Sequence, residues 1–280
     1  NTMPELPEVE TNSRALKSQI LHKKILGIEV SGKRVIRNHK NISEIKNKII
    51  GKTITDVFRI GKQVALQLSN REFVLFHLMM TGKLLVNQPS PSSFLAEGEE
   101  TQSKERKHDR LIIFLSGKNK LVFNDIRQFG KCQVIKNLDG VSGHDPLQIS
   151  WSDFQKAVLA KDKVLKIFML EQKPISGIGN IYADEILWSA GIHPLRRTKS
   201  LSSAEIKKLF NSTKNILNFA IQKKGTSARD YRLPDGSQGE YYNFRKVYQR
   251  AGEKCKKCSG VIQRIMVGGR STHFCPKHQK

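Results

Sequence analysis

The sequence predicts an α+β protein, with a helix and a strand-rich half followed by a helical half that ends in a metal-binding ribbon. Three observations predict it: short Val-, Ile- and Phe-rich segments in the first half, helical spacing in the second, and paired cysteines near the end. Because 280 residues exceed the usual ~100–200 of one domain, we expect two, 1–137 and 153–280, joined by a linker at 138–152.

The strand-rich half is preceded by a helix, predicted from Leu6, Val9, Leu16 and Ile20 on one helical face. The antiparallel strands are expected within residues 53–68, 72–79, 110–115, 120–123 and 131–135, which Gly, Asn and Ser separate. Residues 88–109 are polar and longer than most loops, so we expect a mobile insertion there.

The helical half follows residues 138–150, whose glycines and proline are typical of a linker. Helices are expected at 152–159, 164–172, 180–190 and 203–223. The break at 173–179 exposes backbone N–H groups of Gly177 and Gly179 before the helix that begins at Asn180. Alone, this pattern fits an ordinary helix–helix turn as well as an anion-binding corner, and the basic charge and the cysteine motif described below favour the corner.

The net charge limits the partners. Lys and Arg number 49 and Asp and Glu 25, so 49 − 25 = +24, which indicates a polyanion. Nucleic acid is the leading interpretation; an anionic membrane surface and a basic face without a partner are the alternatives. No apolar run reaches about 18 residues and no secretory signal opens the sequence, so we expect no membrane span and a cytoplasmic protein.

The C-terminal cysteines form a metal-binding pattern. Cys255-x-x-Cys258, sixteen residues, then Cys275-x-x-His278 supplies three thiolates and an imidazole, which fits one closed, structural Zn²⁺ site. The ribbon is expected at 250–280 with its turn at Gly268–Gly269. Its last 30 residues carry 7 − 1 = +6 charges, and Arg270 beside the turn is best placed to reach a phosphate.

Three motifs resemble formamidopyrimidine-DNA glycosylases, bacterial enzymes that remove oxidised purines. They are 4–10 (Pro-Glu-Leu-Pro-Glu-Val-Glu), 177–185 (Gly-Ile-Gly-Asn-Ile-Tyr-Ala-Asp-Glu), and 269–272 (Gly-Arg-Ser-Thr) before Cys275. The likeness spans nearly the whole chain. It implies an N-terminal helix with an antiparallel β-sandwich, a helical domain with a helix-two-turn-helix and a zinc ribbon, and double-stranded DNA between the two domains.

The resemblance also implies catalytic roles. Pro4 matches the family's nucleophile, whose free amine attacks sugar C1′ and forms a Schiff base, and Glu5 beside it matches the proton shuttle. Lys62 matches a lysine that contacts phosphate and assists proton transfer, and Asn180 with Arg270 matches the phosphate clamp. From the residues alone, the favoured interpretation of Glu5 and Glu8 is that they are ordinary acids at a helix start.

Further matched residues concern the DNA. Met80, Arg127 and Phe129 match the trio that fills the void left by a flipped base, although a Met and a Phe are more often core residues. The segment 225–247, with Arg229, resembles the lesion-recognition loop of the purine-specific branch, which favours oxidised purines such as 8-oxoguanine and formamidopyrimidines. An ordinary loop leading to the ribbon is the alternative.

The expected function is a bifunctional glycosylase and abasic-site lyase of base-excision repair, monomeric and associated with the bacterial nucleoid. An endonuclease VIII-like enzyme for oxidised pyrimidines and a non-catalytic damaged-DNA-binding protein are the alternatives. Two departures from the family stand out. His278 replaces the usual fourth cysteine, and Asn1-Thr2-Met3 precede Pro4, so its nitrogen is a tertiary amide that cannot attack; we expect Met3 to be the natural initiator, removed in the cell.

Overall fold

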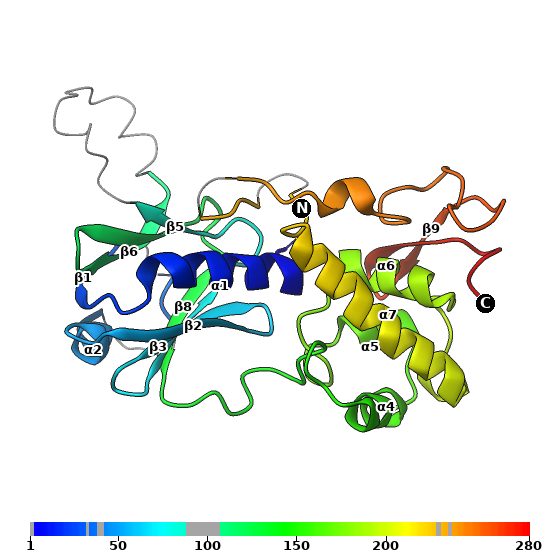
Figure 1. Cartoon of the computed structure of the whole chain (residues 1–280), viewed down its shortest axis with the longest axis horizontal. Helices are drawn as coiled ribbons and strands as arrows, with labels where there is room; N and C mark the ends of the chain where they lie inside the picture. Colours follow the sequence, from blue (N-terminus) through cyan, green and yellow to red (C-terminus); the bar gives the residue numbers. More distant parts are fainter. Residues whose placement is uncertain (1–2, 32–33, 38–41, 88–106, 228–230, 235–236) are drawn as a thin grey trace.

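The computed structural model describes all residues except 1–2, 32–33, 38–41, 88–106, 228–230 and 235–236. The first helix, α1 (Leu6–Ile20), has Pro7 in its first turn, where the missing N–H removes no helical hydrogen bond. The helix begins beside the helical half and runs from there along the strand-rich half (Figure 1). Its first residue, Leu6, packs into the hydrophobic core of the helical half, whereas Val9, Leu16 and Ile20 pack into that of the strand-rich half. Both halves are therefore anchored to one helix.

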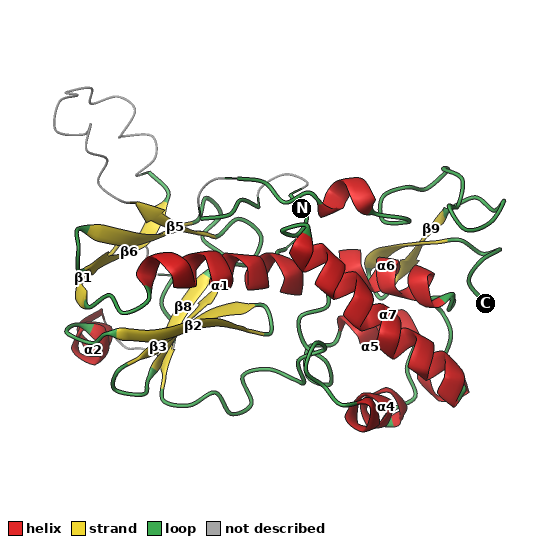
Figure 2. Cartoon of the chain, in the orientation of Figure 1, coloured by secondary structure: helices red, strands yellow, loops and turns green. Residues whose placement is uncertain are grey.

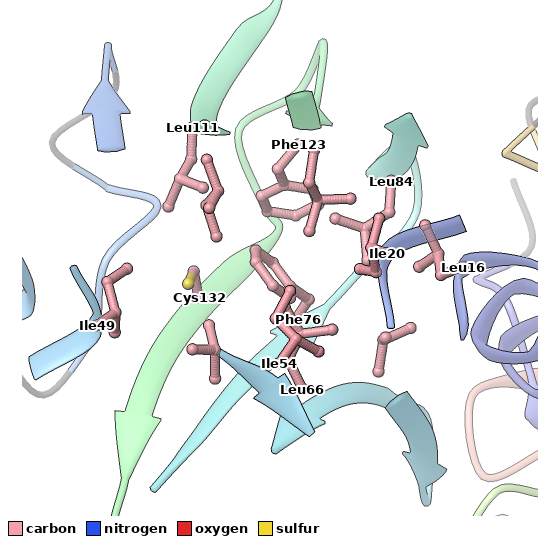
Figure 3. Packing of buried hydrophobic residues seen from close by; sticks show 14 of the residues in the cluster. Leu16, Ile20, Ile49, Ile54, Leu66, Phe76, Leu84, Leu111, Phe123 and Cys132 are labelled. Carbon is pink, nitrogen blue, oxygen red and sulfur yellow. The ribbon is translucent and has the colours of Figure 1, made fainter. Parts of the chain in front are cut away.

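The strand-rich half is an antiparallel β-sandwich, as expected. One sheet has the order β1 (Ile25–Val30), β6 (Asp109–Leu115), β7 (Asn119–Asn124), β5 (Lys83–Asn87). The other has the order β2 (Ile54–Ile60), β3 (Gln63–Leu68), β4 (Phe73–His77), β8 (Lys131–Ile135). Phe76 and Phe123 meet edge-to-face between the sheets, 5.5 Å apart at their ring centroids (Figure 3).

Several predicted elements of this half need correction. Residues 53–68 form a hairpin rather than one strand, because Ile60 pairs with Gln63 across a turn made by Gly61 and Lys62. The strands β1 and β5 and the short helix α2 (Ile42–Ile49) were not predicted from sequence. Of the predicted insertion 88–109, residues 88–106 lie outside the described residues, and Asp109 already belongs to β6.

The helical half contains the four expected helices with small shifts (Figure 2). They are α4 (Trp151–Leu159), α5 (Leu165–Leu170), α6 (Asn180–Ala190) and α7 (Ser203–Gln222). The helix α4 starts one residue earlier than predicted because Ser150 is its N-cap, with Oγ accepting from Asp153 N at 3.1 Å. Short 3₁₀ turns lie at Thr198–Ser200 and Tyr241–Phe244.

The ribbon pairs β9 (Gln263–Val267) with β10 (Arg270–Phe274), as the spacing predicts. Gly268 and Gly269 both have positive φ, 55° and 73°, which is the backbone conformation that a two-residue type I′ turn requires. Arg270 thus begins the strand that leaves the turn and is exposed. Within the part of the chain that the structure describes, no helix is long and apolar enough to cross a membrane.

Candidate active site

Buried Pro4 and Glu5, directly before α1, lie beside the N-terminus of α6. Leu6 N donates to Gly177 O at 2.9 Å, which fixes the α5–α6 break beside Glu5. The Glu5 carboxylate, 3% exposed, accepts from the backbone N–H groups of three residues, Gly179 at 2.8 Å, Ile181 at 2.9 Å and Tyr182 at 3.3 Å. The predicted anion-binding corner is therefore confirmed for Gly179, and within the protein its ligand is Glu5, whereas Gly177 N donates to Gln172 Oε1 at 2.9 Å and takes no part in it.

Glu8 is a second buried carboxylate, one turn along α1 and 2% exposed. It accepts from Glu5 N at 2.8 Å, from Tyr182 Oη at 2.5 Å and from Thr226 N at 2.6 Å. Gly225, before Thr226, has φ +76°, and a Cβ there would lie 2.7 Å from Glu8 Oε1, so only glycine lets this segment approach. Glu8 was given no site role from sequence; its spacing of three residues from Glu5 was the available signal.

The two carboxylates face Lys62. Burial raises the pKa of Glu5, while the positive charge of Lys62 and the backbone N–H donors oppose that rise. Burial and the neighbouring Glu5 charge raise the pKa of Glu8 to about 7. For Lys62, burial lowers the pKa, the charges of Glu5 and Glu8 oppose that change, and Arg270 adds to it. The β2–β3 turn therefore brings Lys62 into the electrostatic field of both carboxylates and of the ribbon.

His77, at the end of β4, also belongs to this neighbourhood and was missed from sequence. Burial lowers its pKa to about 4, and the charges of Lys62 and Arg37 contribute. Its Nδ1 accepts from Met79 N at 3.2 Å, so the imidazole is neutral at physiological pH and orders the turn before Met80. Nothing in the sequence distinguished His77, a single histidine in a strand, from an ordinary core residue.

The structure brings Met80, Arg127 and Phe129 together. The Arg127 guanidinium lies over the Phe129 ring at 4.6 Å, and its Nη1 contacts Met80 Sδ at 3.8 Å. Buried Asp125 fixes their loop by accepting from Arg127 N at 3.2 Å and Gly130 N at 2.7 Å, and it also bonds the Thr81 hydroxyl. Phe129 is 42% exposed, so it is not the core residue that its type alone suggested.

The two residues expected to clamp phosphate come from adjacent elements. Asn180 is the first residue of α6, and its Nδ2 donates to Ser271 O at 2.9 Å, directly after Arg270. The Arg270 side chain is exposed, and it is close enough to affect the pKa of Lys62. Arg229 lies outside the described residues.

The cysteine cluster fits a zinc ion. The Sγ atoms of Cys255, Cys258 and Cys275 lie within 4.8 Å of one another and form no disulfide. Backbone and indole N–H groups point at the sulfurs: Gly260 N to Cys258 at 3.3 Å and Trp188 Nε1 to Cys255 at 3.4 Å, which suits thiolates.

His278 is not part of this 4.8 Å cluster. Its Nε2 lies 2.9 Å from Trp188 O. A carbonyl oxygen can only accept, so Nε2 carries the proton and Nδ1 is the nitrogen able to bind a metal.

Comparison with known sequences identifies the fold and the site as those of a class of DNA-repair glycosylases. Residues 3–132 match the formamidopyrimidine-DNA glycosylase N-terminal domain, 143–231 its H2TH domain, and 252–277 the zinc finger found in FPG and IleRS. The formamidopyrimidine-DNA glycosylase of Carboxydothermus hydrogenoformans is 42% identical, covering 99% of this chain and 100% of that protein. The Streptococcus mutans enzyme is 34% identical, with 99% and 100% coverage.

Solved structures give the same result. A Lactococcus lactis FPG mutant in complex with a Fapy-dG containing DNA matches with a TM-score of 0.84 and 34% identity over 99% of this chain and 100% of that one. MutM in complex with carbocyclic 8-oxo-G containing DNA matches with the same TM-score, identity and coverage.

The chain belongs to the formamidopyrimidine-DNA glycosylase family. It is a DNA glycosylase with one structural zinc site in its C-terminal ribbon.

Proposed function

We propose that this glycosylase removes oxidised purines, including formamidopyrimidines and 8-oxoguanine, from double-stranded DNA and then cleaves the abasic site. The relatives' DNA complexes with Fapy-dG, carbocyclic 8-oxo-G and an abasic site support this substrate class. One observation carries the chemistry: Glu5, Glu8 and Lys62 converge beside Pro4 at the N-terminus of α6.

The proposed first step is nucleophilic attack by the Pro4 nitrogen on sugar C1′, which requires a chain that begins at Pro4. An α-amino group has a pKa of about 8, and the adjacent helix start disfavours its protonated form, so free amine is present at neutral pH. Expulsion of the base leaves a Schiff base to the sugar. Elimination of both flanking phosphates then breaks the strand.

Proton transfer is assigned to Glu5 and Lys62. Burial raises the pKa of the Glu5 carboxyl, which makes it better suited than an ordinary carboxylate to hold and return the proton that opening of the sugar ring requires. Lys62 is assigned the phosphate contact, and its lowered pKa makes it easier for the amine to exchange a proton there.

DNA contacts are assigned to the remaining residues. Asn180 and Arg270 clamp the phosphates beside the flipped nucleotide, and Met80, Arg127 and Phe129 fill the space that the base leaves. Arg229 is assigned to the loop that recognises the lesion. At the ribbon, the spacing Cys275-x-x-His278 assigns His278 as the fourth zinc ligand through Nδ1, which requires its ring to move toward the three sulfurs from its position beside Trp188 O.

A panel of duplexes tests the substrate class. A chain expressed from Met3, so that processing leaves Pro4 first, is given matched duplexes with 8-oxoguanine, a formamidopyrimidine, thymine glycol or no lesion. Purine lesions should be excised and their strands cut to phosphate ends. Faster excision of thymine glycol would favour the endonuclease VIII-like alternative, and tight binding without excision would favour a damage-binding protein.

A further inference from the structure

A buried charge cluster joins α5, α6 and the zinc ribbon away from the carboxylates of the active site. Lys166 and Asp184 have side chains that are 0% exposed, and Lys166 Nζ contacts Asp184 Oδ1 at 2.6 Å. The other oxygen, Asp184 Oδ2, accepts from His273 N at 2.9 Å and His273 Nδ1 at 3.0 Å. One carboxylate of α6 therefore bonds a helix on one side and a ribbon strand on the other.

This cluster touches both halves of the proposed phosphate clamp. Asp184 lies one helical turn after Asn180, and Lys166 Nζ also donates to Asn180 O at 3.2 Å. His273 lies three residues after Arg270 on β10. Asn180 Nδ2 also bonds Ser271 O directly at 2.9 Å, so the position of Arg270 relative to Asn180 is set by that bond together with the bonds that converge on Asp184.

Fold stability alone does not require such a cluster. Removing a lysine and an aspartate from water costs several kcal/mol for each ion, and apolar residues of similar volume are often as stable or more so. A charged, hydrogen-bonded cluster instead holds the groups that it joins in one defined arrangement. The zinc ligands hold the base of the ribbon, where Cys275 directly follows β10. Arg270 lies at the opposite end, the tip of the ribbon, beside the Gly268–Gly269 turn.

We propose that Asp184, held by Lys166 and bonded to His273, is a positioning residue that fixes the spacing between Asn180 and Arg270 so that both reach the DNA backbone. The inference rests on the proposed clamp of Asn180 and Arg270. Without Asp184 the ribbon keeps its zinc and its fold but presents Arg270 in a range of positions, and the contact with phosphate weakens.

Three variants test this role. His273→Phe removes the Nδ1 donor, keeps a ring against Tyr248, whose centroid lies 5.3 Å away, and leaves the Lys166–Asp184 pair intact. Asp184→Asn keeps the volume but offers one acceptor oxygen to three donors. Lys166→Met combined with Asp184→Asn leaves no unpaired buried charge, so it covers the case in which Asp184→Asn alone fails to fold.

The comparison variants are Arg270→Ala, which removes the arginine half of the clamp, and Val158→Ala, which truncates a buried residue of α4 outside the cluster. For each folded protein, zinc content, melting temperature and the affinity for a duplex with a tetrahydrofuran abasic site are measured over a series of salt concentrations.

The variants of the cluster should retain one zinc per chain yet bind about tenfold more weakly, as expected for the loss of about 1.4 kcal/mol. The double-logarithmic salt slope should become shallower by about 0.9, the value for one phosphate contact. Adding Arg270→Ala to Asp184→Asn should cause little further loss, because both remove the same contact. Val158→Ala should lower the melting temperature without changing the slope.

If Arg270→Ala binds DNA weakly but the cluster variants keep the wild-type affinity and salt slope, the clamp is supported and the role of Asp184 is refuted. Loss of zinc from these variants would refute it too, since the ribbon's fold rather than its placement would then depend on Asp184. Unchanged binding by Arg270→Ala would reject the clamp and this inference with it.

Discussion

Replacing Glu5 by Gln separates chemistry from structure at the centre of the site. The Glu5 carboxylate accepts from Gly179 N, Ile181 N and Tyr182 N, and the amide of Gln keeps only one acceptor oxygen. Hydrogen bonds to charged groups contribute about 1.5–3 kcal/mol each, while the variant no longer buries a charge. We expect the free energy of unfolding to fall by about 1–3 kcal/mol, which leaves the protein folded.

The effect on catalysis should be much larger. Proton transfer by a positioned side chain contributes about 10²–10⁴ in rate, so single-turnover excision of 8-oxoguanine should slow by that factor, equivalent to about 3–5 kcal/mol. Affinity for an abasic-site duplex should change less than about threefold, because the contacts assigned to phosphate belong to other residues.

Glu185→Gln is the matched control. Glu185 is also fully buried and also accepts from three backbone N–H groups, those of Lys246, Val247 and Tyr248 at 2.8–2.9 Å. It should lose comparable stability and keep an excision rate within about tenfold of the parent. A Glu5→Gln protein that excises within about threefold of the parental rate would show that Glu5 only joins α1 to α6, and the assignment of proton transfer would be wrong.

Three further outcomes are expected. Because the pKa of Glu8 is raised from 4.5 to about 7, the folded state binds more protons than the unfolded state between these values; stability should fall as pH rises from about 4.5 to 7, by up to about 3 kcal/mol. Urea unfolding should show a flatter profile for Glu8→Gln, and an unchanged profile would assign the slope to other groups. Elemental analysis should find one zinc per chain, kept in His278→Cys and lost in Cys258→Ser; zinc retention by Cys258→Ser would contradict the ligand set. The log of the DNA affinity should fall linearly with log salt concentration, and a slope near zero would argue against phosphate contacts.

The sequence predicted those helices and strands whose ends are set by residues close to them in the chain. The bounds of β8 and α6 agree with those predicted, since β8 alternates buried and partly buried residues and α6 lies between Gly179 and Gly191. By contrast, β1 contains Gly27 at an irregular register and α2 has only eight residues, so neither gave a clear period. The division into domains at 138–152 stays a prediction.

The candidate site was predictable only in part, because its contacts join residues that are far apart in the sequence. Motif resemblance singled out Glu5, but its bonds cross 176 residues of sequence to Ile181, and those of Glu8 cross 218 to Thr226. Such pairings depend on how α1 packs between the two halves. The same holds for Asp184 and His273, 89 residues apart, whose residue types carry no signal until the ribbon is placed against α6.

The central claim, catalysis by the Pro4 amine, is tested most directly by borohydride trapping. A chain that begins at Pro4 and the chain that begins at Asn1 are each incubated with 8-oxoguanine duplex and borohydride, and covalent adducts are mapped by peptide sequencing. We expect an adduct on the N-terminal proline of the first chain and none with the second, whose Pro4 nitrogen is an amide. An adduct that maps to Lys62, or tight binding by the Pro4 chain with no adduct at all, would contradict the account.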